Sequence, residues 1–447
     1  MNATSRTTEP RPPRPDPYPG PAAAVLPPLS LLDQVADLRS GRLDLPTHVE
    51  RLLTRIDRLD PAVHAFVPEP GRYRRLAAEA RDLAARDPAD LPLYGAAVGV
   101  KDVLHVAGLP THAGSALPPG VLAGPEAAAV TRLRAAGALI AGKTVTTEFA
   151  LTAPGPTRNP RALTHTPGGS SSGSAAAVAA GLLPLALGTQ TLGSVIRPAA
   201  YCGVLGFRPT HGRIPTTGLL PNSPTLDAVG CFTADLPSLQ LAAALLCDDW
   251  SPPAGAPNAQ PVLGVPTGRY LDQVDPDALT AFTRHLADLG VTVRHVDALP
   301  DLDDLTHHAT VIHHYELAHR LGELVNRFGA LLRPETAAAI RRGQDVDRAD
   351  YLAALAAREG FRHRLTGTMS DHHLDLFATP AAPGPAPLGL DSTGSPALSL
   401  PWSHAGFPAL TLPTTLTPLP LGLQLIAHPH ADEALLHTAA HLQHMAD

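Results

Sequence analysis

Residues 166–210 read TPGGSSSGSAAAVAAGLLPLALGTQTLGSVIRPAAYCGVLGFRPT, and this stretch decides the fold. It contains two clusters rich in glycine and serine, at residues 168–174 and 188–194. Residues 175–180 are nearly all alanine and predict a short helix, because small side chains let backbones approach closely. The apolar run 182–187, bounded by glycine at both ends, predicts a buried strand. Two serine-bearing turns are therefore expected at the ends of a packed helix and strand.

The two turns have the composition that acyl-transfer chemistry requires. Glycine-rich turns leave backbone N–H groups uncovered, and a row of such donors beside a hydroxyl stabilises a developing oxyanion. The stretch therefore predicts a site where one serine is brought against another.

The two clusters resemble the amidase signature family of serine hydrolases, whose members use a Ser-Ser-Lys triad. The family's Gly-Gly-Ser-Ser element matches the residues that begin at Gly168 and place Ser170 third. Its Gly-Ser turn matches Gly193-Ser194, and its lysine, found in a Val-Lys-Asp context, matches Lys101.

Similarity extends well outside these motifs. Further segments resemble family segments in family order, and they lie at residues 142–150, 159–169, 224–230 and 419–427. The resemblance therefore covers about residues 29–447, nearly the whole chain.

The resemblance implies a role for each motif residue. Ser194 would attack the carbonyl, Ser170 would relay its proton, and Lys101 would be the base. Apolar residues surround Lys101, and a lysine inside a buried strand is costly unless it is neutral or paired. The oxyanion hole would consist of the backbone N–H groups of Thr191, Leu192, Gly193 and Ser194, and the supporting loop of Gly168, Gly169, Ser171 and Ser172.

The second cluster departs from the commoner family form. That form has aspartate, glycine and arginine where this chain has Gln190, Leu192 and Ile196, and Arg197 comes one residue later than the family arginine. The triad is untouched, but no substrate-binding role is carried over to Arg197.

The remaining chain predicts one large α/β domain. Residues 1–28 are rich in proline and predict a disordered tail, and residues 29–447 form the amidase domain with a signature core at about 95–235. Strands alternating with helices predict a mixed, largely parallel central sheet with helices on both faces. We expect helices at about 31–60 (two), 72–85, 127–136, 277–289, 303–366 (several) and 432–444, and strands at 96–104, 138–141, 262–265, 291–296, 374–379, 409–413 and 421–426.

Composition and charge limit the classes of partner that we expect. The net charge is −7, the pI is about 6.3, and no run of lysine and arginine occurs, so we expect a small-molecule amide substrate and no nucleic acid. No apolar stretch is long enough to span a membrane. Three scattered cysteines predict reduced core residues in a cytoplasmic protein, and a homodimer is possible.

Three competing motifs are each less consistent with their context. Residues 137–144 match the phosphate-loop pattern, but their middle is apolar and predicts a strand. Residues 169–173 match the nucleophile elbow of α/β-hydrolases, which would make Ser171 the nucleophile, but no buried strand precedes them. The histidine-rich segment 307–319 is too loosely spaced for a zinc site, so no metal or cofactor is expected.

The sequence therefore predicts an amidohydrolase that cleaves a linear carboxamide through a Ser194 acyl-enzyme. Three alternatives remain open. In the first, the chain is the amidase subunit of a tRNA-dependent amidotransferase, which the variant second cluster disfavours. In the second it is an esterase, and in the third it is a non-catalytic protein on the same scaffold.

Overall fold

The computed structural model describes residues 25–253, 255, 258, 260–414 and 419–446. Most of the predicted tail, residues 1–24, lies outside the described residues. Just after it, the buried Leu26 donates its N–H to the carbonyl of Ala180 at 3.2 Å. The described chain therefore begins on the turn that follows the alanine-rich helix.

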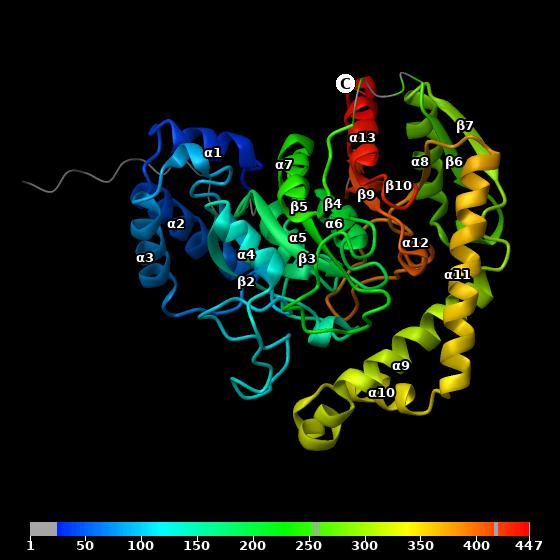
Figure 1. Cartoon of the computed structure of the whole chain (residues 1–447), viewed down its shortest axis with the longest axis horizontal. Helices are drawn as coiled ribbons and strands as arrows, with labels where there is room; N and C mark the ends of the chain where they lie inside the picture. The colour runs from blue at the N-terminus through cyan, green and yellow to red at the C-terminus, as the bar shows by residue number, and fades with distance from the viewer. Residues whose placement is uncertain (1–24, 254, 256–257, 259, 415–418, 447) are drawn as a thin grey trace, which may run out of the picture.

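One sheet organises the described residues. Its strands are β1 (Ala97–Lys101), β2 (Leu139–Thr144), β3 (Leu185–Gln190), β4 (Leu205–Arg208), β5 (Ala228–Thr233), β6 (Val262–Pro266), β7 (Thr292–Val296), β8 (Leu376–Pro380), β9 (Ala409–Thr414) and β10 (Leu421–Ile426). They lie in the order β2-β1-β3-β5-β4-β9-β10-β8-β6-β7 (Figure 1).

The predicted mixed α/β fold with a large central sheet between helices is confirmed, but the sheet is less parallel than predicted. The pairs β1–β2, β1–β3, β6–β7 and β6–β8 are parallel. The central pairs, from β3–β5 through to β10–β8, are antiparallel. The prediction missed β4 and β5, because these strands have only four and six residues and carry no long apolar run.

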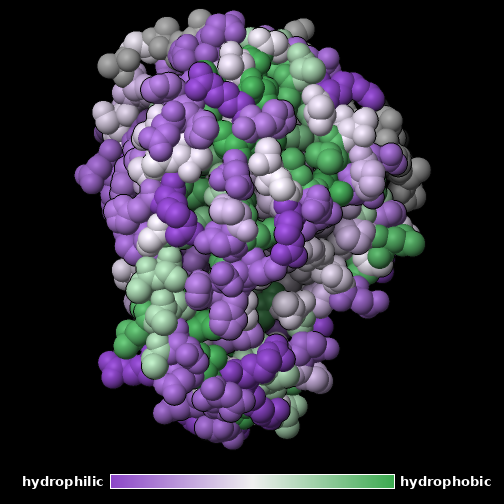
Figure 2. Space-filling model, turned by 90° about the vertical axis from the view of Figure 1, so that its right-hand side faces the viewer, coloured by the Kyte–Doolittle hydropathy of each residue, from purple (hydrophilic) through white to green (hydrophobic). Residues whose placement is uncertain are grey.

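The α-helices are α1 (Leu31–Arg39), α2 (Leu45–Val63), α3 (Arg72–Ala84), α4 (Ala128–Ala135), α5 (Ser172–Ala179), α6 (Ile196–Cys202), α7 (Leu236–Leu246), α8 (Pro276–Asp288), α9 (Leu302–Phe328), α10 (Pro334–Gln344), α11 (Arg348–Asp371), α12 (Leu400–Ala405) and α13 (Asp432–Ala446). Figure 1 shows α1–α3 beyond β2 at one end, and α9 and α10 projecting below the other end. The side that carries α11 is mostly hydrophilic in Figure 2, with apolar residues in separate areas between polar ones.

Side chains alternate between two cores, one on each face of the sheet. Val98, Val100 and Leu187 join the core that α1, α4, α7, α8 and α13 cover. Ala97 and Ala186 point to the opposite face, where α2, α3 and α5 pack. This period of two follows from the pleat of a strand, and it explains why the strands are buried on both faces.

The small residues of α5 let it lie almost against the backbone of neighbouring segments. A Cβ atom added at Gly173 would lie 2.2 Å from the carbonyl oxygen of Ala65 and 2.4 Å from the nitrogen of Val145. Any side chain larger than hydrogen is therefore excluded at this position. The close approach holds the first serine cluster beside the carboxyl ends of β1 and β3.

The segment that matches a phosphate loop is a strand. Residues 139–144 form β2, all six are buried, and no helix begins at Lys143. The amine of Lys143 instead lies 2.7 Å from a carboxylate oxygen of Asp102, and both side chains are almost inaccessible to solvent. The lysine of the matching pattern is thus engaged in a buried ion pair and is not available to bind a phosphate.

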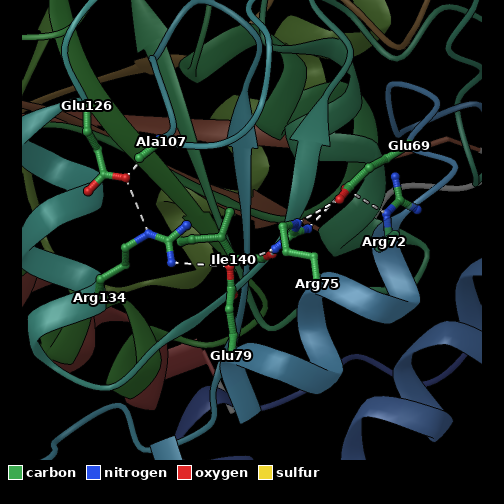
Figure 3. Close-up of polar contacts among 8 residues, drawn as sticks. All are labelled: Glu69, Arg72, Arg75, Glu79, Ala107, Glu126, Arg134 and Ile140. Carbon is green, nitrogen blue, oxygen red and sulfur yellow. Dashed lines mark hydrogen bonds and ion pairs between the residues drawn. The ribbon is translucent and has the colours of Figure 1, made fainter. Parts of the chain in front are cut away.

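The outer edge of β2 is covered by charged side chains of α3 (Figure 3). Arg75 donates to the carbonyl of Ile140 at 2.8 Å and to both carboxylate oxygens of Glu69. Glu79 joins Arg75 to Arg134 on α4. A sheet edge that is hydrogen-bonded by a helix in this way is closed to pairing with another strand.

Removal of one partner of the Lys143–Asp102 pair should destabilise the fold. Lys143→Met leaves a buried carboxylate without its cation, so we expect the free energy of unfolding in urea to fall by about 3–5 kcal/mol. The double variant that combines Lys143→Met with Asp102→Asn should regain part of this lost stability. Arg269→Met, which breaks the exposed Arg269–Asp303 pair, is the control and should cost less than about 1 kcal/mol. Equal losses in Lys143→Met and Arg269→Met would contradict the importance of burial.

Candidate active site

Lys101 is the last residue of β1, and its amine is fully enclosed between β1 and β3. The Nζ atom lies 2.7 Å from Ser170 Oγ, 2.8 Å from Thr189 Oγ1 and 3.3 Å from the carbonyl oxygen of Thr189. In this arrangement the amine donates to all three oxygens, and the hydroxyl of Ser170 can also donate to the amine when Lys101 is neutral.

The surroundings of Lys101 favour its neutral form. Burial lowers the pKa of Lys101 well below its ordinary value of 10.5, and the charge of Arg197 lowers it further. The carboxylate of Asp227 acts in the opposite direction and raises it. The net direction is downward, so the amine of Lys101 is neutral at lower pH than the amine of an exposed lysine.

Ser170 connects Lys101 to the first cluster. Its peptide bond with Gly169 is cis, and its carbonyl accepts the N–H of Thr147 at 3.2 Å. The side chain is buried and its hydroxyl faces Lys101. The structure therefore brings the predicted bridge and the predicted base together.

Ser194 lies on the turn that follows β3. The N–H of Ser171 donates to the carbonyl of Ser194 at 3.4 Å, so the two serine clusters are in backbone contact. The Ser194 hydroxyl makes no hydrogen bond to any described residue, and the link from Ser170 to Ser194 is not formed in this structure. Such contacts often tighten only when substrate binds.

The same turn presents unused backbone donors. In the described parts of the chain, none of the hydrogen bonds uses the N–H groups of residues 191–194 as donors. The side chain of Thr191 donates to Asp227 at 2.7 Å, and the other oxygen of Asp227 accepts the N–H groups of Asn222 and Ser223 at 2.8 Å each. Burial raises the pKa of Asp227 to about 6. Backbone N–H groups without partners are the kind of donor that stabilises an oxyanion.

The departures from the commoner motif have structural explanations. Gln190 Oε1 accepts the N–H groups of Val195 and Ile196 at 2.7 and 2.9 Å, so it caps the start of α6. Arg197 lies on α6 and reaches back to donate to the carbonyl of Gly169 at 2.7 Å. Its burial lowers its pKa to about 10.

The remaining residues of the first cluster support the loop. Ser171 donates to the carbonyl of Thr189 at 3.1 Å and accepts the N–H of the same residue at 3.2 Å. Ser172 donates to the carbonyl of Gly168 at 2.9 Å. Ser171 is fully buried and no strand precedes it, so the geometry of a nucleophile elbow is not formed.

The other candidate sites are not assembled. No group of three histidine, cysteine, aspartate or glutamate side chains suited to a metal occurs among the described residues. In the predicted histidine cluster, His313 instead contacts Asn222 at 2.9 Å. Cys202, Cys231 and Cys247 are free and buried. In the described part of the chain, no helix is long and apolar enough to cross a membrane.

Sequence reasoning missed two residues that contact the site. Thr189 holds Lys101 from the end of β3, and a threonine near the end of an otherwise apolar strand is a signal for it. Asp227 precedes β5, which was not predicted, so nothing placed its carboxylate beside Thr191.

Comparison with known proteins identifies one family. A model of the Amidase family matches residues 47–436. The chain is 32% identical to a glutamyl-tRNA(Gln) amidotransferase subunit from Geobacter metallireducens, over 87% of this chain and 91% of that protein. The protein of the same name from Thermus thermophilus is 34% identical over the same shares. A solved structure described as a crystal structure of an amidase is 32% identical with a TM-score of 0.84, and the match covers 93% of this chain and 99% of the other.

These relatives correct the predicted partners. The expectation of a small-molecule amide as the only partner, with no nucleic acid, is wrong, because relatives that match most of this chain are named as subunits of a glutamyl-tRNA(Gln) amidotransferase. The expectation relied on the net charge of −7 and the lack of a basic run. The charge of one chain, however, does not report on the surfaces of other subunits.

The neutral state of Lys101 can be measured directly, because Lys101 and Lys143 are the only lysines in the sequence. Protein grown with lysine labelled by ¹³C at Cε should show two lysine NMR signals, and Lys143→Met assigns them. We expect the Lys101 signal to titrate well below pH 10.5, because burial disfavours its charge. A Lys101 signal that stays in its charged position up to pH 10 would contradict a neutral base.

Proposed function

The chain belongs to the amidase family, and on that premise we propose that it cleaves a carboxamide as the amidase subunit of a tRNA-dependent amidotransferase. Ser194 is the nucleophile, Ser170 the proton bridge and Lys101 the base. The observation that carries the amide chemistry is the enclosed amine of Lys101, 2.7 Å from Ser170, whose loop is hydrogen-bonded to residues 191–194, here called the nucleophile turn.

The proposed acylation begins with Lys101 in its neutral form. Ser170 gives its proton to the amine and takes the proton of Ser194 as the Ser194 oxygen attacks the carbonyl carbon. The backbone N–H groups of residues 191–194 stabilise the oxyanion that forms. When the intermediate collapses, the carbon–nitrogen bond breaks, the proton returns through Ser170 to the leaving nitrogen, and ammonia departs.

Deacylation repeats the same relay with water. Ser170 and Lys101 remove a proton from the attacking water, and Ser194 leaves with that proton when the ester bond breaks. Over the full cycle Ser194, Ser170 and Lys101 return to their starting protonation states, because water replaces the proton that leaves with ammonia. An amidotransferase needs such a step, because its amidase component must release nitrogen from one amide before that nitrogen joins another acyl group.

The names of the curated relatives that match most of this chain support a subunit role over a generic hydrolase of linear amides. The chain spans 91% of the length of the two amidotransferase subunits, so nearly all of their length has a counterpart here. The variant second cluster had argued against this role. However, Gln190 forms two hydrogen bonds within the turn, so the variant is consistent with an intact site.

Alanine substitution should lower turnover most at Ser194, less at Ser170 and least at Ser171. A fluorophosphonate should label Ser194, and Ser194→Ala should abolish both labelling and amide cleavage while thermal stability hardly changes. Ser170→Ala should lower turnover by about 10²- to 10⁴-fold, the usual scale for loss of general acid–base help. Ser171→Ala, the control within the same loop, should lower it less. A label on Ser171, found by peptide mapping, would overturn the assignment.

The subunit role is tested by isolating the tagged full-length chain from its source cells. We expect other protein subunits to copurify and to raise the release of ammonia from glutamine or asparagine by at least about 10-fold, the scale of a coupling free energy near 1.4 kcal/mol. Nitrogen transfer to glutamyl-tRNA should require those subunits and should be lost in Ser194→Ala. Full activity on simple amides from a chain that copurifies with nothing would contradict the subunit role and leave the amidase chemistry intact.

A further inference from the structure

The nucleophile turn is held from outside the signature core by one side chain of α12. Ser403 is fully buried, and its hydroxyl donates to the carbonyl of Leu192 at 2.6 Å. The same hydroxyl accepts a hydrogen bond from the amide nitrogen of Gln190 at 2.9 Å. Gln190 and Ser403 are therefore hydrogen-bonded to each other, and together they contact both ends of the turn. Ser403 contacts Leu192 at its start, and Gln190 contacts Val195 just after it.

Ser403 fixes the orientation of the peptide plane that precedes Gly193. In a trans peptide the C=O of one residue and the N–H of the next point in opposite directions. The carbonyl of Leu192 points to Ser403, so the N–H of Gly193 points away from α12. That N–H is one of the free donors of the turn.

Gln190 fixes the plane that follows Ser194 by the same geometry. Its side-chain oxygen accepts the N–H of Val195, so the carbonyl of Ser194 points away from Gln190. The carbonyl of Ser194 meets the N–H of Ser171 instead. The Leu192–Gly193 and Ser194–Val195 peptide planes are thus set by a single pair of hydrogen-bonded side chains.

We propose that Ser403 and Gln190 are positioning residues, which orient the peptide planes around Ser194 so that the backbone donors of the turn face the oxyanion. Neither side chain touches the substrate carbonyl in this role, and both act through the backbone. The inference rests on the proposed function, because it assigns the source of preorganisation for the same nucleophile.

The packing of the turn supports this role. A Cβ atom added at Gly193 would lie 3.1 Å from the Cβ of Pro396, so the turn is also pressed against the loop that leads into α12. Ser403 therefore contacts a turn that also lies close to Pro396. If its hydrogen bond is lost, rotation of the Leu192–Gly193 plane is the change that remains available.

The test is the rate at which a fluorophosphonate labels Ser194, because this reaction also places negative charge on an oxygen in the oxyanion position. Ser403→Ala should lower the maximal labelling rate by roughly 10- to 100-fold, the scale of a misaligned donor. The inhibitor's reversible binding constant should change by less than about 2-fold, because binding precedes charge development. A merely structural defect would change both constants or the thermal unfolding temperature.

Two further variants sharpen the test. Gln190→Met keeps the side chain's approximate volume, removes its hydrogen bonds and should lower the maximal rate similarly. The double variant should be no slower than the slower single one, because both changes release the same turn. Ser399→Ala is the matched control: it removes a buried hydroxyl at the start of α12 that has no hydrogen-bond partner among the described residues, and it should label at the wild-type rate.

The outcomes separate this inference from the proposed function. If wild-type Ser194 is not labelled, the proposed function fails and the inference fails with it. If wild-type Ser194 is labelled and Ser403→Ala and Gln190→Met label at the same rate, only the positioning role is overturned. Losses that multiply in the double variant would also overturn it, because they would show that the two residues act independently.

Discussion

The enclosure of one amine, that of Lys101, is the constraint on which the site depends. A buried ammonium is strongly disfavoured, so the fold must supply polar contacts that suit a neutral amine, and Thr189 and Ser170 supply them. Among 34 basic side chains the only lysines are Lys101 and Lys143, and both are buried beside this site. Elsewhere the chain uses arginine, which cannot release its proton and so could not replace Lys101 in the proposed role of base.

The sheet brings these groups together through its parallel part. Strands β1 and β3 run in the same direction, so Lys101 at the carboxyl end of one lies beside Thr189 at the carboxyl end of the other. The turn after β3 then places Ser194 at the same edge. The antiparallel pairing of β3 with β5 places the residue that precedes β5, Asp227, beside the turn that follows β3. Its carboxylate accepts a hydrogen bond from Thr191 there.

Local sequence patterns were sufficient to predict the elements that have a clear amphipathic, alanine-rich or apolar pattern. The amphipathic helices α1 and α2, the alanine-rich α5 and the strand pair β9 and β10 were predicted with small shifts at their ends. Strands β4 and β5 were not, because their strand character arises from burial between β3 and β9. The motif residues of the site were found through the family resemblance. Thr189, Asp227 and Ser403 were not, because their roles depend on contacts that sequence spacing does not encode.

The signature core predicted at about 95–235 therefore does not contain everything that shapes the site. Thr393 contacts Arg197 at 3.2 Å, and Ser403 contacts the carbonyl of Leu192, from positions about 200 residues further along the chain. The pairing of β4 with β9 fixes α12 relative to the nucleophile turn, since α12 immediately precedes β9. Long-range pairing of this kind is costly to close and forms late relative to local structure. The direction of the free N–H groups of the turn therefore depends on contacts between segments that are about 200 residues apart in the chain.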